Sequence, residues 1–167
     1  YFGGGFGDLE HVCRAVTVPV LCKDFMVDRV QIDTAYTLGA DMILLIAAAL
    51  TDDELGTLSG HARGMNLSIL YEIHTSGEFS RIAHLDPGIV GVNSRDLESM
   101  TIDHDGACRV MAGLPVNITR VAESGMKTAA DVRRMSQAGA NAFLVGTALM
   151  SAPNPGALLK ELTMAAG

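Results

Sequence analysis

The sequence has no tryptophan, few aromatic residues and little positive charge. Lysine and arginine together number 12 against 19 aspartate and glutamate residues, so the formal net charge is −7. Nucleic acids and anionic membranes attract basic surfaces, and we therefore expect neither as a partner of this acidic chain. An anionic small molecule would have to be held locally, by one lysine, one arginine or backbone N–H groups.

Motifs for metals and cofactors are also missing. Cys13, Cys22 and Cys108 form no CxxC pair, the histidines form no HExxH pattern, and no GxGxxG follows an apolar run. Metal and dinucleotide sites need such spacings, so we expect no metal and no cofactor. An odd and low cysteine count is typical of reduced thiols, and we expect a cytoplasmic protein.

Long hydrophobic runs are absent as well. The longest, Met42–Leu50, is far shorter than the roughly 20 residues of a membrane span, so we expect no membrane insertion. The chain instead contains six short apolar runs without polar alternation, which is typical of parallel strands buried on both faces. These runs are Pro19–Phe25, Asp41–Ala47, Leu67–Ile73, Gly88–Asn93, Val116–Ala122 and Asn141–Val145.

Helix signals lie between the apolar runs. Thr51, Thr75 and Thr128 each precede an acidic residue by three positions, which predicts capping boxes. Gly39 and Gly139 stand in near copies of one segment, where a left-handed residue ends a helix just before a strand. Two further helix starts are predicted at Asp28 and at Asn154–Pro155.

Strands that alternate with helices predict an α/β protein with a parallel sheet. The strand starts recur at about the spacing of a TIM (β/α)8 barrel. Six strands are visible where a closed barrel needs eight. We therefore expect one domain over residues 1–167 that is an incomplete barrel, with about strands 3–8 and their helices and without the first two strands. An open, flavodoxin-like sheet of six strands is the alternative.

Two charged residues interrupt apolar strands. Lys23 lies at the end of the first run and Glu72 near the end of the third. A buried charge is costly unless it is paired, so both residues are candidates for chemistry at the carboxyl ends of the strands, where barrel active sites lie. The alternatives are a solvated Lys23 beyond the strand and a structural, paired Glu72.

Further polar and glycine residues follow the last three strands. Asn93 ends the fourth run and Arg95 follows it, although an asparagine in this place can also simply satisfy a turn. The loops after the last two strands contain the residues Glu123, Ser124, Gly125, Gly146 and Thr147. Barrel enzymes commonly bind phosphate in the loops after their last two strands, through backbone N–H groups. The pattern predicts a sugar-phosphate ligand.

Five segments resemble the indole-3-glycerol-phosphate synthase family, in its order and at its spacing: Tyr1–Gly4, Pro19–Phe25, Gly91–Leu97, Glu123–Gly125 and Val145–Met150. The resemblance implies a carboxy-lyase of tryptophan biosynthesis that uses neither metal nor cofactor. Its substrate would be 1-(2-carboxyphenylamino)-1-deoxyribulose 5-phosphate. Ring closure, loss of carbon dioxide and loss of water would give indole-3-glycerol phosphate.

The resemblance also implies a role for each site residue. Lys23 matches a general acid that protonates the substrate carbonyl, and Glu72 matches an acid–base residue of later proton transfers. Asn93 matches a catalytic residue that holds the substrate. Arg95, Glu123 and Ser124 match substrate-binding residues, and Gly125, Gly146 and Thr147 match phosphate contacts.

The chain departs from the family at two of these segments. Cys22 stands where the family is expected to have arginine, and Thr147 where serine or glutamate is commoner. The family's first strand, with another glutamate and a phosphate-binding lysine, is not found, so we expect a fragment with little activity alone. Self-association, or fusion to another enzyme of the tryptophan pathway, could complete it. The alternatives are a phosphoribosylanthranilate isomerase-like barrel and a non-catalytic, phosphate-binding half-barrel.

Overall fold

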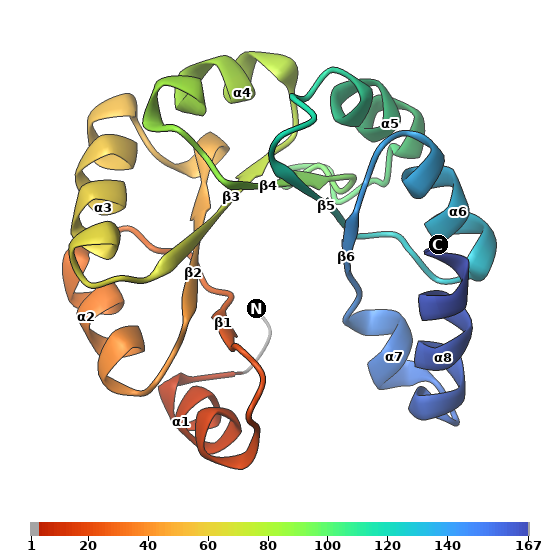
Figure 1. Ribbon diagram of the computed structural model, residues 1–167, viewed down its shortest axis with the longest axis horizontal. Helices are drawn as coiled ribbons and strands as arrows, with labels where there is room; N and C mark the ends of the chain where they lie inside the picture. Colours follow the sequence, from red (N-terminus) through yellow and green to blue (C-terminus); the bar gives the residue numbers. More distant parts are fainter. Residues whose placement is uncertain (1–3, 167) are drawn as a thin grey trace. The chain divides into compact units, whose positions relative to one another are not determined.

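The structure, a computed structural model, describes residues 4–166 (Figure 1). It contains two compact units. The first is formed by the chain up to Glu72 together with Ser80–Pro87, and the second by Ile73–Phe79 together with the chain from Gly88 onward. Both consist of parallel strands that alternate with helices, which confirms the α/β class.

The first unit is built on strands β1, β2 and β3. Strand β1 pairs in parallel with β2, and β2 pairs in parallel with β3. Its elements are α1 (Phe6–Ala15), β1 (Leu21–Cys22), α2 (Arg29–Thr37), β2 (Met42–Ile46), the 3₁₀ helix η1 (Ala47–Ala49), α3 (Asp52–Gly64), β3 (Ser68–Ile73) and the 3₁₀ helix η2 (Ala83–Leu85). Helix α4 (Ser76–Ile82) is divided between the two units.

The core of the first unit lies between β2 and the helices that cover it. Ile43 and Leu45 of β2 are fully buried, as are Ile32 of α2 and Leu55 of α3. Figure 1 shows α2 and α3 side by side along the same side of this strand. Burial of such side chains stabilises the unit by about 1.5–3 kcal/mol each.

The second unit repeats this arrangement around strands β4, β5 and β6. Strand β5 pairs in parallel with β4 and with β6. The elements are β4 (Ile89–Asn93), α5 (His104–Ala112), β5 (Thr119–Glu123), α6 (Ala129–Gln137), β6 (Ala142–Leu144), α7 (Thr147–Ser151) and α8 (Pro155–Ala165). Helix α8 packs against α6 and α7, and α5 packs against β4 (Figure 1).

The predicted helix starts are largely confirmed. The hydroxyls of Thr51 and Thr128 and the carboxylate of Asp28 accept backbone N–H groups in the first turns of α3, α6 and α2. Asn154 caps α8 in the same way. At Thr75 the box is altered, because the carboxylate of Glu78 accepts the backbone N–H of His74, 2.7 Å away.

The near-copied segments around Gly39 and Gly139 make equivalent contacts in the two units. Gly39 and Gly139 have φ of +95° and +108°, as expected for glycines that end a helix. Two residues later, Asp41 accepts the backbone N–H of Val20, and Asn141 accepts that of Arg120. Each polar side chain thus ties the start of one strand to the start of the preceding one.

Two strands differ from the sequence prediction by more than one residue at an end. β1 is only Leu21–Cys22 rather than Pro19–Phe25, and β5 begins at Thr119 and continues to Glu123. Val116, which was expected to begin the fifth strand, is exposed. Pairing with the neighbouring strand sets these limits, since Asn93 at the end of β4 lies in register with Glu123.

Candidate active site

The charged pair of the first unit forms a direct ion pair. Nζ of Lys23 lies 2.9 Å from Oε2 of Glu72, with the lysine side chain 37% exposed and the glutamate side chain 2% exposed. Burial of a lone carboxylate would be strongly unfavourable, so the ammonium group compensates for it. The pair offers a proton donor that solvent can reach and a carboxylate held away from water.

The sheet brings these two residues together although 49 positions separate them in the sequence. Lys23 follows the end of β1, and Glu72 lies opposite Ile46 of β2 near the end of β3. Because the three strands are parallel, their carboxyl ends lie at one edge of the sheet. The long lysine side chain crosses β2 to reach the carboxylate.

In the second unit, Asn93 and Glu123 occupy paired positions at the carboxyl ends of β4 and β5. Both are buried. Oδ1 of Asn93 accepts the backbone N–H of Arg95 at 3.0 Å, so the asparagine does satisfy a turn. Nη1 of Arg95 donates to the carbonyl of Met100 at 3.2 Å, which braces the loop after β4.

The turn after β5 has an unusual backbone. Ser124 and Gly125 have φ of +63° and +77°, in the left-handed region. A Cβ atom on Gly125 would lie only 2.6 Å from Cε1 of His104, in the first turn of α5. Glycine is therefore required at 125 for both its backbone conformation and its close approach to the imidazole ring.

Gly146 and Thr147 follow the neighbouring strand, β6, and begin α7. Gly146 has an ordinary φ of −106°, and no atom lies within 4 Å of the position that a Cβ would take. The register places Leu144 opposite Glu123, so this turn and the Ser124–Gly125 turn follow adjacent strands. Seven of the nine predicted site residues thus belong to the second unit, while Lys23 and Glu72 belong to the first.

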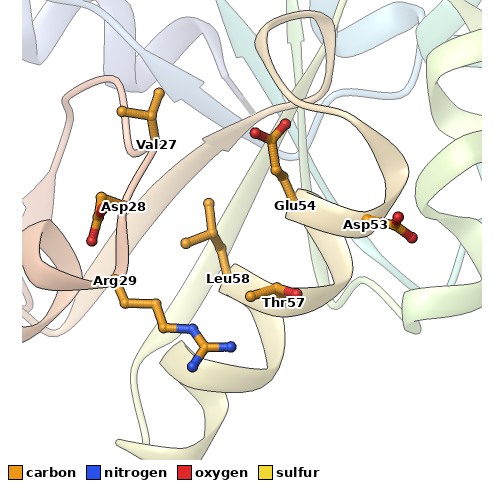
Figure 2. Close-up of a pocket in the computed structure, with 7 residues that line it drawn as sticks. All are labelled: Val27, Asp28, Arg29, Asp53, Glu54, Thr57 and Leu58. Atoms are coloured by element: carbon orange, nitrogen blue, oxygen red, sulfur yellow. The ribbon is translucent and has the colours of Figure 1, made fainter.

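A groove on the first unit is lined by none of these residues. It has a volume of about 330 Å³ and runs between the N-terminal parts of α2 and α3 (Figure 2). Asp28 and Glu54 on its walls are already engaged in helix capping. The remaining lining residues are Val27, Arg29, Asp53, Thr57 and Leu58, and none of the seven was predicted as a site residue.

Cys22, the departure from the family pattern beside Lys23, is buried with a reduced thiol. Burial, followed by the nearby Asp24 and Cys13, raises the pKa of this thiol to about 11. The neutral thiol therefore contributes no charge next to the ion pair at neutral pH.

Among residues 4–166, no three His, Cys, Asp or Glu residues gather in a way that could hold a metal ion. Nor does any helix there have the length and apolar character needed to cross a bilayer.

Sequence reasoning did not single out His104 or Arg81, although His104 lies against a candidate residue and Arg81 binds a connection at the carboxyl end of β2. His104 lies against Gly125, and Arg81 binds the connection that follows β2. Neither has a local sequence signal, because the partners lie about 20–35 positions away.

Comparison with known proteins gives one consistent family. The family model described as indole-3-glycerol phosphate synthase matches residues 1–162. The indole-3-glycerol phosphate synthase of Sulfurisphaera tokodaii is 41% identical over 97% of this chain and 65% of its own length. That of Exiguobacterium sibiricum is 42% identical over 93% of this chain and 60% of its own length. The chain therefore spans somewhat less than two thirds of these relatives.

A solved structure shows the same fold at low sequence identity. The 3-hexulose-6-phosphate synthase of Salmonella typhimurium superposes with a TM-score of 0.82 at 11% identity, covering 97% of this chain and 80% of its own. The likeness supports a TIM-barrel-like α/β fold with six parallel strands. The family match over 162 residues and the 41–42% identity lead to the same conclusion about ancestry: the chain belongs to the indole-3-glycerol phosphate synthase family.

Proposed function

We propose that the chain supplies the catalytic lysine and glutamate of an indole-3-glycerol-phosphate synthase. The reaction is the conversion of 1-(2-carboxyphenylamino)-1-deoxyribulose 5-phosphate to indole-3-glycerol phosphate. The observation that carries the proposal is the Lys23–Glu72 ion pair, in a chain that belongs to this family.

Lys23 acts as the general acid. Its ammonium protonates the carbonyl oxygen of the ribulose moiety while the aromatic ring carbon attacks the carbonyl carbon. Carbon dioxide then leaves, and the electrons of its bond to the ring restore aromaticity. Glu72 holds the ammonium in place and takes part in the proton transfers that lead to loss of water.

The remaining residues bind the substrate. Asn93, Arg95, Glu123 and Ser124 line the substrate site, while Gly125, Gly146 and Thr147 contact the phosphate, largely through the main chain. The two turns that carry the phosphate contacts follow the adjacent strands β5 and β6, which supports a shared role. We further propose that β1–β6 correspond to strands 3–8 of one eight-stranded barrel.

The test is product formation with purified substrate, measured by the fluorescence of the indole product. The 167-residue chain is assayed alone and as a chimera preceded by the first two βα units of the relative from Sulfurisphaera tokodaii. We expect turnover in the chimera and little in the chain alone. Lys23→Ala in the chimera should abolish turnover and leave product affinity largely unchanged.

Two outcomes would reject the proposal. Turnover of phosphoribosylanthranilate, with none of the deoxyribulose substrate, would assign the isomerase reaction instead. If a folded chimera binds the substrate or phosphate but forms no product, the protein is a binding protein and not an enzyme. A folded state, shown by a cooperative urea transition, is the control in both cases.

A further inference from the structure

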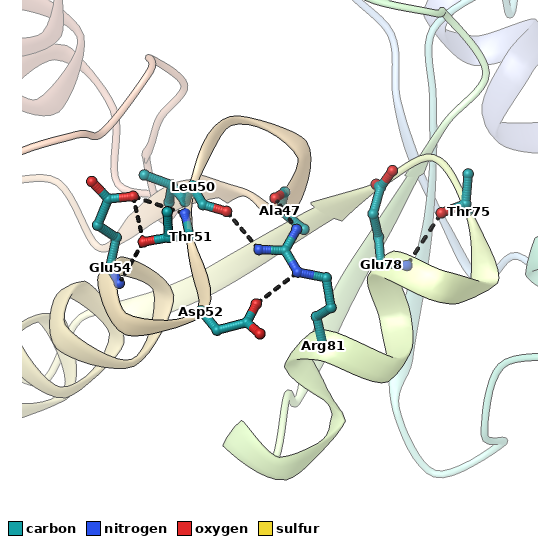
Figure 3. A network of polar contacts seen from close by, with 8 residues as sticks. All are labelled: Ala47, Leu50, Thr51, Asp52, Glu54, Thr75, Glu78 and Arg81. Carbon is teal, nitrogen blue, oxygen red and sulfur yellow. Dashed lines mark hydrogen bonds and ion pairs between the residues drawn. The ribbon is translucent and has the colours of Figure 1, made fainter.

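Arg81, in the last turn of α4, binds the connection that follows β2. Its Nη1 donates to the carbonyl of Ala47 at 2.7 Å and its Nη2 to the carbonyl of Leu50 at 2.6 Å. Nε donates to Oδ1 of Asp52 at 2.7 Å, in the first turn of α3. Figure 3 shows the guanidinium pointing into this connection, with a dashed line to Leu50 and another to Asp52. One side chain thus joins η1, the end of the connection and the next helix.

This connection, residues 47–51, is called the 47–51 turn below. It begins directly after Ile46, which lies opposite Glu72 in the paired strands β2 and β3. Ala47 and Leu50 are buried, while the two alanines between them are exposed. The turn therefore has a fixed inner side and an exposed tip, and its first residue lies beside the strand end that carries Glu72.

We propose that Arg81 is a positioning residue for the active site: it holds the 47–51 turn in place next to Glu72. The inference rests on the proposed function, because it assigns the turn a place at the edge of the Lys23–Glu72 pair. Arg81 does not itself touch the reacting atoms. It acts through the backbone of the turn.

The choice of arginine follows from the geometry. A guanidinium presents several N–H donors in one plane, so it can bind two carbonyls and one carboxylate at the same time. The side chains of Arg81 and Asp52 are 32% and 65% exposed, so water screens their ion pair, and the two carbonyl contacts provide most of the hold on the turn. Lysine could keep the attraction to Asp52 but could not reproduce the three-way contact.

The first unit offers a matched control in Arg63. This arginine lies near the end of α3 and donates to the carbonyls of Leu85 and Asp86, close to the start of β4. It therefore also ties a helix to backbone carbonyls. However, this Arg63 contact lies at the end of the sheet opposite to the carboxyl ends of β2 and β3. In barrels, the residues at that end serve stability and not catalysis.

The experiment compares Arg81→Ala, Arg81→Lys, Asp52→Ala and Arg63→Ala. Amide hydrogen exchange of residues 47–51, followed by mass spectrometry, is measured in the 167-residue chain. The kcat and KM are measured in the polypeptide that shows turnover in the assay above, at a temperature where every variant is folded. Urea denaturation gives the folded fraction of each variant.

We expect Arg81→Ala to exchange faster at residues 47–51 and to lower kcat by about tenfold, with KM changed less than about twofold. Arg81→Lys and Asp52→Ala should lie between it and the unaltered protein. Arg63→Ala should be destabilised, yet show normal exchange at 47–51 and a normal kcat.

A normal kcat in folded Arg81→Ala would overturn the proposal, as would equal losses of kcat in Arg81→Ala and Arg63→Ala. If the unaltered protein shows no turnover, the proposed function fails by itself. The exchange rates then decide the inference. Unchanged exchange at residues 47–51 in Arg81→Ala overturns it. Faster exchange there in the Arg81 and Asp52 variants, but not in Arg63→Ala, supports it.

Discussion

Nζ of Lys23 lies 2.9 Å from Oε2 of Glu72, and the two side chains differ sharply in exposure, at 37% and 2%. The carboxylate is buried, while the lysine side chain is partly exposed. This asymmetry suits a general acid that must reach a substrate, and it suits a buried carboxylate that holds the acid in place. Most of the expected functional behaviour follows from this pair.

Substitution of either member should remove most of the activity. Lys23→Ala and Glu72→Gln are each expected to lower kcat by about 10²- to 10⁴-fold, the usual contribution of a general acid–base group. If the two groups act as a unit, as the proposed function requires, the double variant of the chimera should lose about as much as the more damaged single variant. Steady-state rates of the four proteins measure this coupling.

A side-chain contact on the outside of the same unit provides the control. Asp33 and His61 join α2 and α3, with 2.6 Å between Oδ1 and Nε2. Asp33→Asn should leave kcat unchanged. Losses for Lys23→Ala and Glu72→Gln that simply multiply in the double variant would show that the two residues act independently.

Gly125→Ala should destabilise the protein by about 2–4 kcal/mol, since it adds left-handed strain to a steric clash. The new methyl group would meet the His104 ring at 2.6 Å. His104→Ala in the same chain should restore part of the loss, because it removes the clash with the ring but not the one with Cγ2 of Ile102 at 2.9 Å. Urea denaturation followed by circular dichroism measures these free energies of unfolding.

Gly146→Ala is the matched comparison, because its φ is ordinary and the space around it is open. It should change the free energy of unfolding by no more than about 0.5 kcal/mol. Equal losses for Gly125→Ala and Gly146→Ala would mean that the Gly125–His104 contact does not limit the residue at position 125.

The carboxylate of Asp131 should make folding sensitive to acid. Partial burial raises its pKa, but hydrogen bonds from Lys127 and Thr128 outweigh this, and the net pKa lies below the ordinary 3.8. A lowered folded-state pKa contributes stability above pH 3.8 that is lost as the pH falls through the folded-state value. The stability advantage over Asp131→Asn should therefore be full near neutral pH and shrink below about pH 4.

Urea titrations of the unaltered chain and of Asp131→Asn across this range measure the difference. Thr128→Ala removes the hydroxyl that donates to the Asp131 carboxylate and also caps α6, so it should lower stability at every pH. It should reduce the pH-dependent part only partly, because the backbone N–H groups of Lys127 and Thr128 still donate. A stability difference that is independent of pH between neutrality and strong acid would contradict the assignment.

Cys22 should be almost inert toward thiol reagents. Its pKa of about 11 leaves a thiolate fraction at pH 8 on the order of a hundredfold below that of a thiol at the ordinary value of 9.0. Differential alkylation with iodoacetamide, read by mass spectrometry, should label Cys22 only after denaturation or at much higher pH. Cys13 and Cys108 are partly exposed and serve as internal references. Labelling of all three at similar rates in the native protein would contradict the prediction.

Local interactions explain why much of the fold could be predicted from the sequence. The caps at Asp28, Thr51 and Thr128 and the helix-ending glycines depend on residues within four positions of each other. The apolar runs similarly predicted six parallel strands, and charged residues within them predicted where chemistry would lie. The family resemblance, carried by five short segments, was confirmed over 162 residues.

Only the tertiary structure decided which residues meet. Lys23 and Glu72 are 49 positions apart, and no local rule pairs them before the sheet forms. The same holds for Arg81 with the carbonyls of Ala47 and Leu50, and for His104 against Gly125. Strand limits were also set this way, because hydrogen bonds to a neighbouring strand end β1 at Cys22 and extend β5 to Glu123. The sequence by itself determined the elements and the residue types at their ends, since these depend on local dihedral angles and capping. The contacts between elements depend on sheet register and packing over long sequence separations, and only the folded chain establishes them.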